Sequence, residues 1–183
     1  MGLDHATRRR SAGSAGMIRL NLGSGQRPFD KPFVNVDINP KWEPDVVADG
    51  ASMPMFADGS SDMIVLHHTL EHYGCGEGSA MLQECHRILA PGGSLIVCVP
   101  EMRELAKMWL RGTLDTQVYM TNVYGAFMDS EADRHRWGGD SLSWATYLMS
   151  VAPWNRVTTF DWREIPGASI AKDVWICGLE CVK

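Results

Sequence analysis

Short apolar runs recur along the first half of the chain, and the first three of them end at a glycine or an acidic residue. They cover residues 17–22, 33–37, 45–48, 62–66 and 94–99. Such runs are typical of strands buried on both faces of a parallel sheet. Apolar residues at helical spacing predict helices over residues 79–89, 101–111 and 141–150, and two further strands are expected at 157–162 and 173–182. The pattern predicts one α/β domain.

The connection after the first strand is unusually short for such a fold. A doubly wound domain would place a helix here, but residues 26–32 contain both Pro28 and Pro32. Proline lacks the N–H that a helix needs, so we expect a loop. Glycines 74, 76 and 78 are expected to interrupt the chain before the helix at 79–89, and residues 90–93 to end that helix.

A glycine turn, Gly23-Ser24-Gly25, separates the first two strands, and Asp37 ends the second. Glycine lets the backbone pass close to a ligand, and free N–H groups in such a turn attract an anion. An acid at the end of the next strand can accept hydrogen bonds from two ribose hydroxyls. This layout predicts a nucleotide-type site at the carboxyl edge of the sheet. A nicotinamide-dependent oxidoreductase would need glycine at position 28, which is proline.

Composition indicates a globular protein with a core of its own. The chain has 183 residues, of which 45% are hydrophobic and 21% charged. The net charge of -5 argues against broad binding to nucleic acid or to an anionic membrane. The odd number of cysteines, five in mostly apolar contexts, favours a reduced cytoplasmic protein. We expect residues 1–16 to be a disordered basic tail and residues 17–183 to form a single domain, with no segment long enough to span a membrane.

Several motifs occur together in a fixed order. They are Leu22-Gly23-Ser24-Gly25, Val36-Asp37, Ala48-Asp49, the run MPMFADGSSDMI at 53–64, Leu70-Glu71-His72 and the run ECHRILAPGG at 84–93. Over about residues 17–100 this series resembles class I S-adenosylmethionine (SAM)-dependent methyltransferases of the methyltransferase type 11 group. Residues 123–138 are similar to a compact subgroup with a shortened first crossover. The resemblance implies a Rossmann-like three-layer sandwich with a mostly parallel sheet and an antiparallel last strand.

The same resemblance implies a cofactor site. SAM would be bound by residues 17–100, and its product S-adenosylhomocysteine would leave from there, while residues 101–183 would build the acceptor side. The implied contacts are Gly23, Ser24 and Gly25 beneath the methionine moiety, Asp37 on the ribose, Ile38 on the adenine, Asp49 and Gly50 at the adenine edge, and Leu66 and His67 at the methionine end. Asn21 stands where many relatives carry an acid. With no helix after the glycine turn, Arg27 is expected to supply the charge for the carboxylate.

Methyl transfer from a sulfonium mainly requires alignment of the acceptor and exclusion of water. A base is needed only where the acceptor atom carries a proton. The candidates are His72, which follows the fourth strand, and His135, which lies in a polar segment expected to cover the site. Each also has a structural interpretation, His72 as part of a helix start and His135 as part of a solvated loop. We expect the acceptor to be a small molecule or a saccharide.

Two alternatives stay open at this point. Histidines and cysteines gather at His67, His68, His72, Cys75, Cys85 and His86, and His68 and His72 could share a zinc ion on one helical turn. The absence of a Cys-x-x-Cys pair and the nearby glycines disfavour this, so no metal ligand is predicted. The chain could also be a non-catalytic SAM-binding or partner-binding module derived from a methyltransferase. The sequence predicts no oligomeric state.

Overall fold

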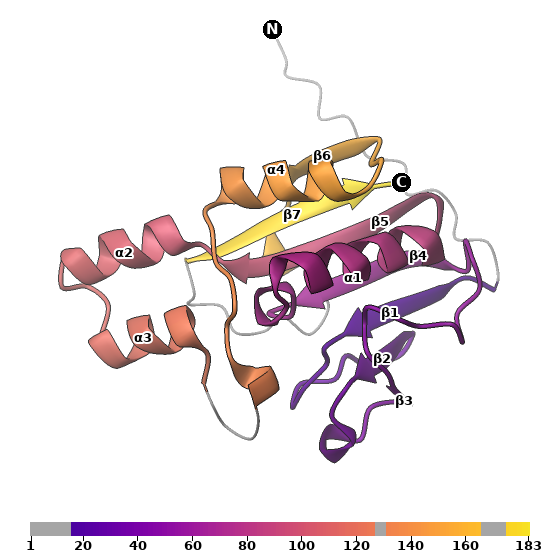
Figure 1. Ribbon diagram of the computed structural model, residues 1–183, viewed down its shortest axis with the longest axis horizontal. Helices are drawn as coiled ribbons and strands as arrows, with labels where there is room; N and C mark the ends of the chain where they lie inside the picture. Colours follow the sequence, from indigo (N-terminus) through magenta and orange to yellow (C-terminus); the bar gives the residue numbers. More distant parts are fainter. Residues whose placement is uncertain (1–15, 127–130, 166–174) are drawn as a thin grey trace, which may run out of the picture.

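The computed structural model describes residues 16–126, 131–165 and 175–183 (Figure 1). Their strands form one sheet in the order β3-β2-β1-β4-β5-β7-β6. The strands are β1 (Ile18–Leu22), β2 (Phe33–Asp37), β3 (Val46–Val47), β4 (Ser61–His67), β5 (Leu89–Pro100), β6 (Arg156–Thr159) and β7 (Ile176–Val182). Pairings among β1 to β5 are parallel, whereas β7 runs antiparallel to both β5 and β6. The predicted Rossmann-like sheet with an antiparallel last strand is confirmed. The predicted N-terminal tail lies outside the described residues except for Gly16.

Helices cover one face of the sheet and extend beyond its carboxyl edge. They are α1 (Cys75–Ile88), α2 (Met102–Leu110), α3 (Thr116–Tyr124) and α4 (Ser141–Val151), with one-turn helices η1 (Pro40–Trp42), η2 (Leu70–His72), η3 (Glu131–Asp133) and η4 (Trp162–Glu164). Helices α1 and α4 lie against the strands, while α2 and α3 project past the end of β5 (Figure 1). Within the described part of the chain, none of the helices combines the length and apolar character that crossing a membrane requires.

Strand residues alternate between two hydrophobic clusters, as the period of two in a strand requires. Leu20, Leu66 and Val97 face α1 and α4, where Leu82 and Trp144 complete the larger cluster. The opposite face is covered by a smaller cluster, which contains Phe29, Phe33, Val65, Ile96, Cys98, Trp162 and Ile165. The sheet is therefore buried on both faces, as the apolar runs predicted.

The first crossover is a loop, as its prolines predicted. Asn35 of β2 fastens this loop: it accepts a hydrogen bond from the Phe29 N–H at 2.8 Å and donates to the Phe29 carbonyl at 2.9 Å. Asn21 of β1 donates to the same Asn35 side chain at 2.9 Å. The Phe29 ring packs edge-on against Phe33 at a centroid distance of 5.2 Å. Side-chain hydrogen bonds and one aromatic anchor thus replace a crossover helix, and Asn21 is one of the buried anchors.

Helix α1 begins at Cys75, so the prediction that glycines interrupt the chain up to residue 78 is wrong. Gly74 caps the helix, because its N–H donates to Glu77 Oε2 at 3.2 Å and its carbonyl accepts from Gly78 N–H at 2.7 Å. A Cβ at Gly78 would lie 3.0 Å from the Tyr147 hydroxyl. Glycine at 78 therefore allows α1 and α4 to approach closely.

Two strand boundaries also differ from the prediction. Strand β5 begins at Leu89, so residues 90–93 lie within it, and Gly92 N–H donates to the Lys183 carbonyl at 2.7 Å. Strand β6 ends at Thr159, and Trp162 belongs to η4. Residues 173–174 of the predicted last strand lie outside the described residues.

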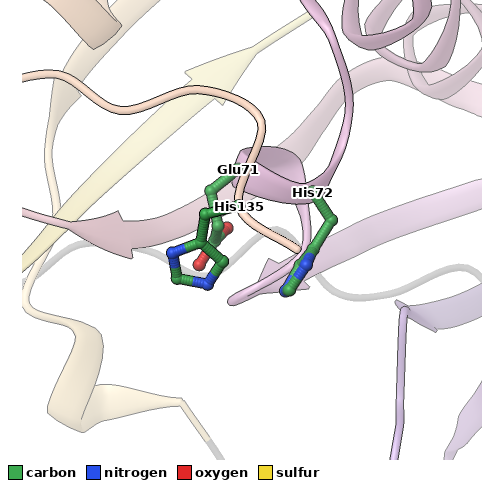
Figure 2. A group of neighbouring side chains, drawn as sticks. All are labelled: Glu71, His72 and His135. Carbon is green, nitrogen blue, oxygen red and sulfur yellow. The ribbon is translucent and has the colours of Figure 1, made fainter. Parts of the chain in front are cut away.

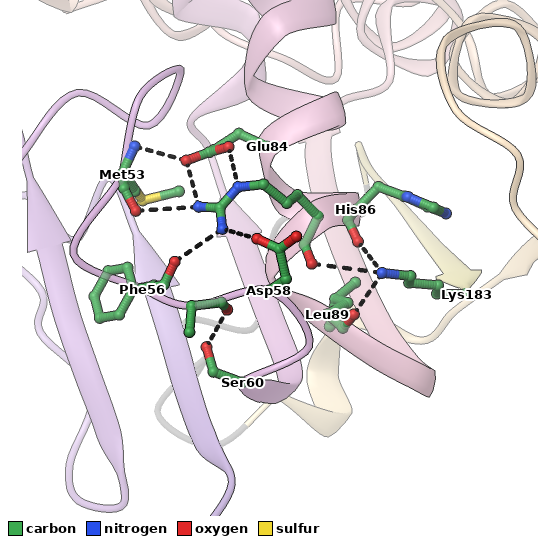
Figure 3. A network of polar contacts seen from close by, with 10 residues as sticks. Met53, Phe56, Asp58, Ser60, Glu84, His86, Leu89 and Lys183 are labelled. Atoms are coloured by element: carbon green, nitrogen blue, oxygen red, sulfur yellow. Dashed lines mark hydrogen bonds and ion pairs between the residues drawn. The ribbon is translucent and has the colours of Figure 1, made fainter.

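The run at 84–93 has a structural role (Figure 3). Arg87 donates from Nε and Nη2 to the two Glu84 carboxylate oxygens, each at 2.8 Å, and from Nη1 to the Phe56 carbonyl at 2.9 Å. Glu84 in turn accepts from the Met53 N–H at 2.8 Å. A bidentate pair of this kind fixes both position and orientation, so it holds the loop before β4 against α1. Lys183 adds hydrogen bonds to carbonyls at the end of the helix.

Candidate functional site

A cavity of about 430 Å³ opens at the carboxyl ends of β1, β2, β3 and β4. It is lined by the segments that follow these four strands, by the first turns of α1 and by part of the loop 132–136. Its lining contains six of the predicted cofactor residues: Gly23, Gly25, Asp37, Ile38, Asp49 and Gly50. The sheet topology thus brings to one place six predicted residues that lie at or just after the ends of three different strands.

The glycine turn is held between β2 and the residue before η2. Gly23 has φ +68° and Gly25 has φ +49°, a region that disfavours side chains. A Cβ at Gly23 would lie 2.5 Å from the side chain of Thr69, whose hydroxyl donates to the Leu22 carbonyl at 2.8 Å. Only glycine fits at position 23 without displacement of Thr69.

The N–H groups of this turn are not free, contrary to the expectation from the sequence. Gly23 and Ser24 both donate to the Val36 carbonyl, at 2.8 and 3.2 Å, and Gly25 donates to Asp37 Oδ2 at 2.7 Å. The physical reason is the short crossover, which folds the turn back onto the end of β2. An anionic ligand group would therefore need another partner than these three N–H groups.

Asp37 keeps capacity for a ligand although it already accepts two hydrogen bonds. Its Oδ2 accepts from Gly25 N–H, and its Oδ1 accepts from Asn39 N–H at 2.8 Å. The residue is 8% exposed, and both it and Asn39 line the cavity. A carboxylate offers about four lone-pair sites, so each oxygen can accept one further hydroxyl.

The wall after β2 and β3 combines apolar and hydrogen-bonding groups. Ile38 is 52% exposed at the cavity, beside Trp42. Tyr73 and Asp49 also line the cavity, and the Tyr73 hydroxyl donates to Asp49 Oδ1 at 3.2 Å. Burial and the neighbouring Asp49 carboxylate raise the pKa of Tyr73, which keeps the hydroxyl protonated. At Gly50 a Cβ would meet the methyl end of the Met81 side chain at 2.5 Å, so a side chain at position 50 would displace this flexible end.

Four predicted contacts do not line the cavity. Leu66 has 0% exposure and packs in the core beneath α1, because its position in β4 points it to that face, so its side chain does not reach the cavity. Ser24 is buried and Arg27 is exposed outside the lining. His67 is partly buried, and burial, with smaller effects from His68 and Arg27, lowers its pKa to about 4.

The two candidate catalytic histidines meet at one end of the loop 131–137. Backbone hydrogen bonds bring them together: Arg136 and Trp137 donate to the Glu71 carbonyl at 2.8 and 3.3 Å, and His135 N–H donates to the Tyr124 carbonyl at 3.0 Å. The rings of His72 and His135 then lie edge to face, with centroids 4.8 Å apart. Figure 2 shows Glu71 and His72 projecting from η2 toward His135, which comes from the loop.

Glu71 is the buried member of this group, at 1% exposure. Its Oε1 lies 3.0 Å from His68 Nδ1. Burial by itself raises the pKa of the Glu71 carboxyl, but the hydrogen bond to His68 and the charges of His68, His72 and His135 together hold it below its ordinary value. Burial also lowers the pKa of His135. The group therefore places two imidazole rings beside a carboxylate, a combination that can accept a proton or hold a cation.

The metal ligands considered from the sequence do not form a set. His68 pairs with Glu71, Cys85 is buried in the core and His86 packs on Trp154 with centroids 4.9 Å apart. All five cysteines are free. Instead Glu71, His72 and His135 each offer one ligand atom, and these atoms lie within 4.8 Å of one another. Sequence reasoning missed Glu71 as a site residue, together with Tyr73, Trp42 and Thr69; the acidic residue directly before His72 was the available signal.

Comparison with known proteins finds one family model that resembles the first half of the chain. Residues 20–97 match the family model described as "Methyltransferase domain". This match confirms the resemblance to the methyltransferase type 11 group, while the compact subgroup stays a prediction. No curated protein matches the chain.

Solved structures share the fold at low identity. The CurJ carbon methyltransferase is 18% identical with a TM-score of 0.59, over 94% of this chain and 50% of that one. A SAM-dependent methyltransferase from Archaeoglobus fulgidus is 13% identical with a TM-score of 0.57, over 92% and 87%. Human N-acetylserotonin methyltransferase, solved with SAM, is 16% identical with a TM-score of 0.58, over 91% and 47%. The chain thus spans about half the length of the first and third of these proteins, and the likeness establishes the class I methyltransferase fold.

Proposed function

We propose that this protein is a SAM-dependent methyltransferase that acts on a small molecule or a saccharide. The observation that carries the proposal is the cavity in which Asp37, at the end of β2, lies between the glycine turn and Ile38. The methyltransferase-domain match covers the same segment, residues 20–97. In this proposal residues 17–100 form the cofactor half of one domain, and residues 101–183 form the acceptor half. The five free cysteines support a cytoplasmic location.

The residues around the cavity fit this cofactor on three counts. The volume of about 430 Å³ falls within the range of about 300–1,000 Å³ that small ligands occupy. The Asp37 carboxylate keeps acceptor capacity for ribose hydroxyls, and Ile38 presents exposed apolar surface for a flat base. Asp49, held by Tyr73 and by the Ala51 N–H at 2.9 Å, would receive the adenine edge with the Gly50 backbone.

His72 and His135 are the groups we assign to the acceptor. Bound SAM supplies an electrophilic methyl group on a sulfonium, so the protein has to align the acceptor and, for a hydroxyl or amine, remove a proton. His72 lines the cavity, and the ring of His135 contacts the ring of His72. The Glu71 carboxylate favours the protonated imidazole and would stabilise the charge that forms there.

Calorimetry tests the cofactor assignment. We expect SAM and S-adenosylhomocysteine to bind and NAD not to bind, and Asp37→Ala to abolish binding. Asp30→Ala is the matched control, since Asp30 is an exposed carboxylate outside the cavity lining. Folded protein that binds neither SAM nor its product would refute the proposal, and binding retained by Asp37→Ala would show that another acid holds the ribose.

A non-catalytic SAM-binding or partner-binding module is the second candidate. The observation that favours it is the glycine turn, whose three N–H groups are used internally. Turnover separates the two: the enzyme should convert SAM to S-adenosylhomocysteine with at least one member of a panel of hydroxylated small molecules and saccharides. A module should bind SAM and convert it with none of them.

A further inference from the structure

We propose that Glu71, His72 and His135 bind one divalent transition-metal ion, such as Zn²⁺, at the wall of the cavity. The ligand set is two imidazoles and one carboxylate, each offering an atom within 4.8 Å of the others. Two nitrogen ligands favour zinc and its transition-metal neighbours over magnesium, which prefers oxygen. The role of the ion in activating the acceptor rests on the proposed function. The binding of the ion to these three side chains does not depend on that function.

The spacing is close to that of a metal centre. Zinc–ligand bonds of about 2.0–2.2 Å place tetrahedral ligand atoms about 3.4 Å apart, so the widest pair, at up to 4.8 Å, has to close by about 1.4 Å. His72 can make this movement, since it is a partly exposed residue at the end of η2. Glu71 is fixed by burial, and His135 by its backbone bond to Tyr124.

The hydrogen bonds of the His72 and His135 rings select the tautomer that can bind a metal ion. His135 Nδ1 lies 2.8 Å from the Asn122 carbonyl, and His72 Nδ1 lies 3.3 Å from the Arg134 carbonyl. A carbonyl only accepts, so each Nδ1 carries the proton and Nε2 keeps its lone pair. Metal-binding histidines commonly donate their second N–H to a carbonyl in this way.

An unpaired buried oxygen points independently to a missing partner. Glu71 Oε2 has no hydrogen-bond partner among the described residues, although Glu71 is 1% exposed. Buried carboxylate oxygens are normally paired, because desolvation of an unpaired one is unfavourable. A cation would pair this oxygen, while His68 on Oε1 would orient the carboxylate as an outer partner.

Three protein ligands leave coordination positions open, as in catalytic zinc sites. Because His72 lines the cavity, an open position would face the acceptor. An acceptor hydroxyl bound there would lose its proton more readily, since a bound cation favours the alkoxide. With both imidazoles bound to the ion, the proton would pass to water in the cavity and not to His72 or His135, and the acceptor oxygen would then take the methyl group from the sulfonium, which leaves as a neutral thioether. The acceptor class that this arrangement selects is an oxygen nucleophile, which agrees with a saccharide or another hydroxylated molecule.

Metal titration of the full chain tests the site directly. After removal of metal by a chelator, Co²⁺ is added and its visible absorption followed, and Zn²⁺ binding is measured by calorimetry, with Mg²⁺ for comparison. We expect one equivalent of Co²⁺ or Zn²⁺ and much weaker binding of Mg²⁺. His72→Ala, His135→Ala and Glu71→Gln should each weaken binding at least tenfold. His86→Ala is the control, because His86 packs on Trp154 away from the cluster.

Melting of the metal-free variants checks that each one folds. His72→Ala is the decisive variant, since removal of a partly exposed side chain leaves the core intact. Absence of stoichiometric binding, or equal affinity in wild type and His72→Ala, would overturn the metal site and leave the cluster as a protein base. SAM calorimetry on the metal-free protein keeps the two proposals separate, because SAM binding without metal binding refutes only the metal site.

Discussion

Replacement of Gly23 by alanine tests how tightly the turn after β1 is held. Gly23 has φ +68°, and a Cβ there would lie 2.5 Å from both Cγ2 and Oγ1 of Thr69. Gly25 has φ +49°, and among the described residues no atom lies within 4 Å of a Cβ built on it. Gly25→Ala therefore shares the backbone strain of Gly23→Ala without the steric conflict, which makes it the matched control.

The size of each effect follows from these two contributions. A left-handed conformation costs a residue with a side chain about 1–2 kcal/mol, and we expect this loss of stability in both variants. Overpacking adds about 1–3 kcal/mol at Gly23 only. Gly23→Ala should therefore lose about 2–5 kcal/mol in total. In a chain of 183 residues, each kcal/mol lowers the melting temperature by about 2–4 °C.

Urea unfolding followed by tryptophan fluorescence measures these losses. A third variant, Gly23→Ala with Thr69→Ala, removes the two atoms that the new methyl group would meet. We expect the double variant to be less destabilised than the sum of its single changes, by about the overpacking contribution of 1–3 kcal/mol. Equal losses at Gly23 and Gly25, or strict additivity in the double variant, would refute the steric account.

Three side chains outside the cavity lining carry the remaining predictions. Burial lowers the pKa of His67 from 6.5 to about 4, so the unfolded chain takes up the proton first and stability falls as pH drops through this window, by up to about 3 kcal/mol. His67→Gln should flatten the dependence of the melting temperature on pH between these values, and an unchanged slope would contradict the assignment. Arg87→Lys loses the bidentate contact with Glu84 and should cost about 1 kcal/mol in urea unfolding, more than Arg163→Lys at an exposed position. Arg27→Ala should weaken SAM binding in calorimetry if its guanidinium neutralises the methionine carboxylate; unchanged affinity would remove Arg27 from the site.

The strands were predictable because their signal is local. Residues 33–37 form β2 as predicted, and most of the predicted first and fourth strands lie in β1 and β4. The start of α1 was not predictable from the sequence, because glycines at 76 and 78 disfavour a helix locally. A side chain at position 78 would press on the Tyr147 hydroxyl of α4, which lies far along the chain, so glycine is favoured there by packing. Tertiary packing decided this boundary against local propensity.

The site shows the same division between local and long-range information. Asp37 and the glycines were found because a strand, a turn and an acid follow one another in sequence. Tyr73 was missed, because only the fold brings its hydroxyl to Asp49. His72 and His135 were each recognised as candidates, but their contact depends on backbone bonds between residues 136–137 and the Glu71 carbonyl. No local pattern encodes that pairing.

These backbone bonds also connect the proposed cofactor half, residues 17–100, with the proposed acceptor half, residues 101–183. The loop 131–137 is fixed to η2 through the Glu71 carbonyl, and Arg136 adds an ion pair to Glu77 of α1 at 2.8 Å. At the other end of the loop, a Cβ at Gly125 would overlap the Asp133 carbonyl, so glycine is needed where α3 meets the loop. Most of these constraints act on the backbone. Under the proposed function, side chains of residues 101–183 outside these contacts would be free to differ with the acceptor, while the backbone keeps His135 beside His72 and Glu71.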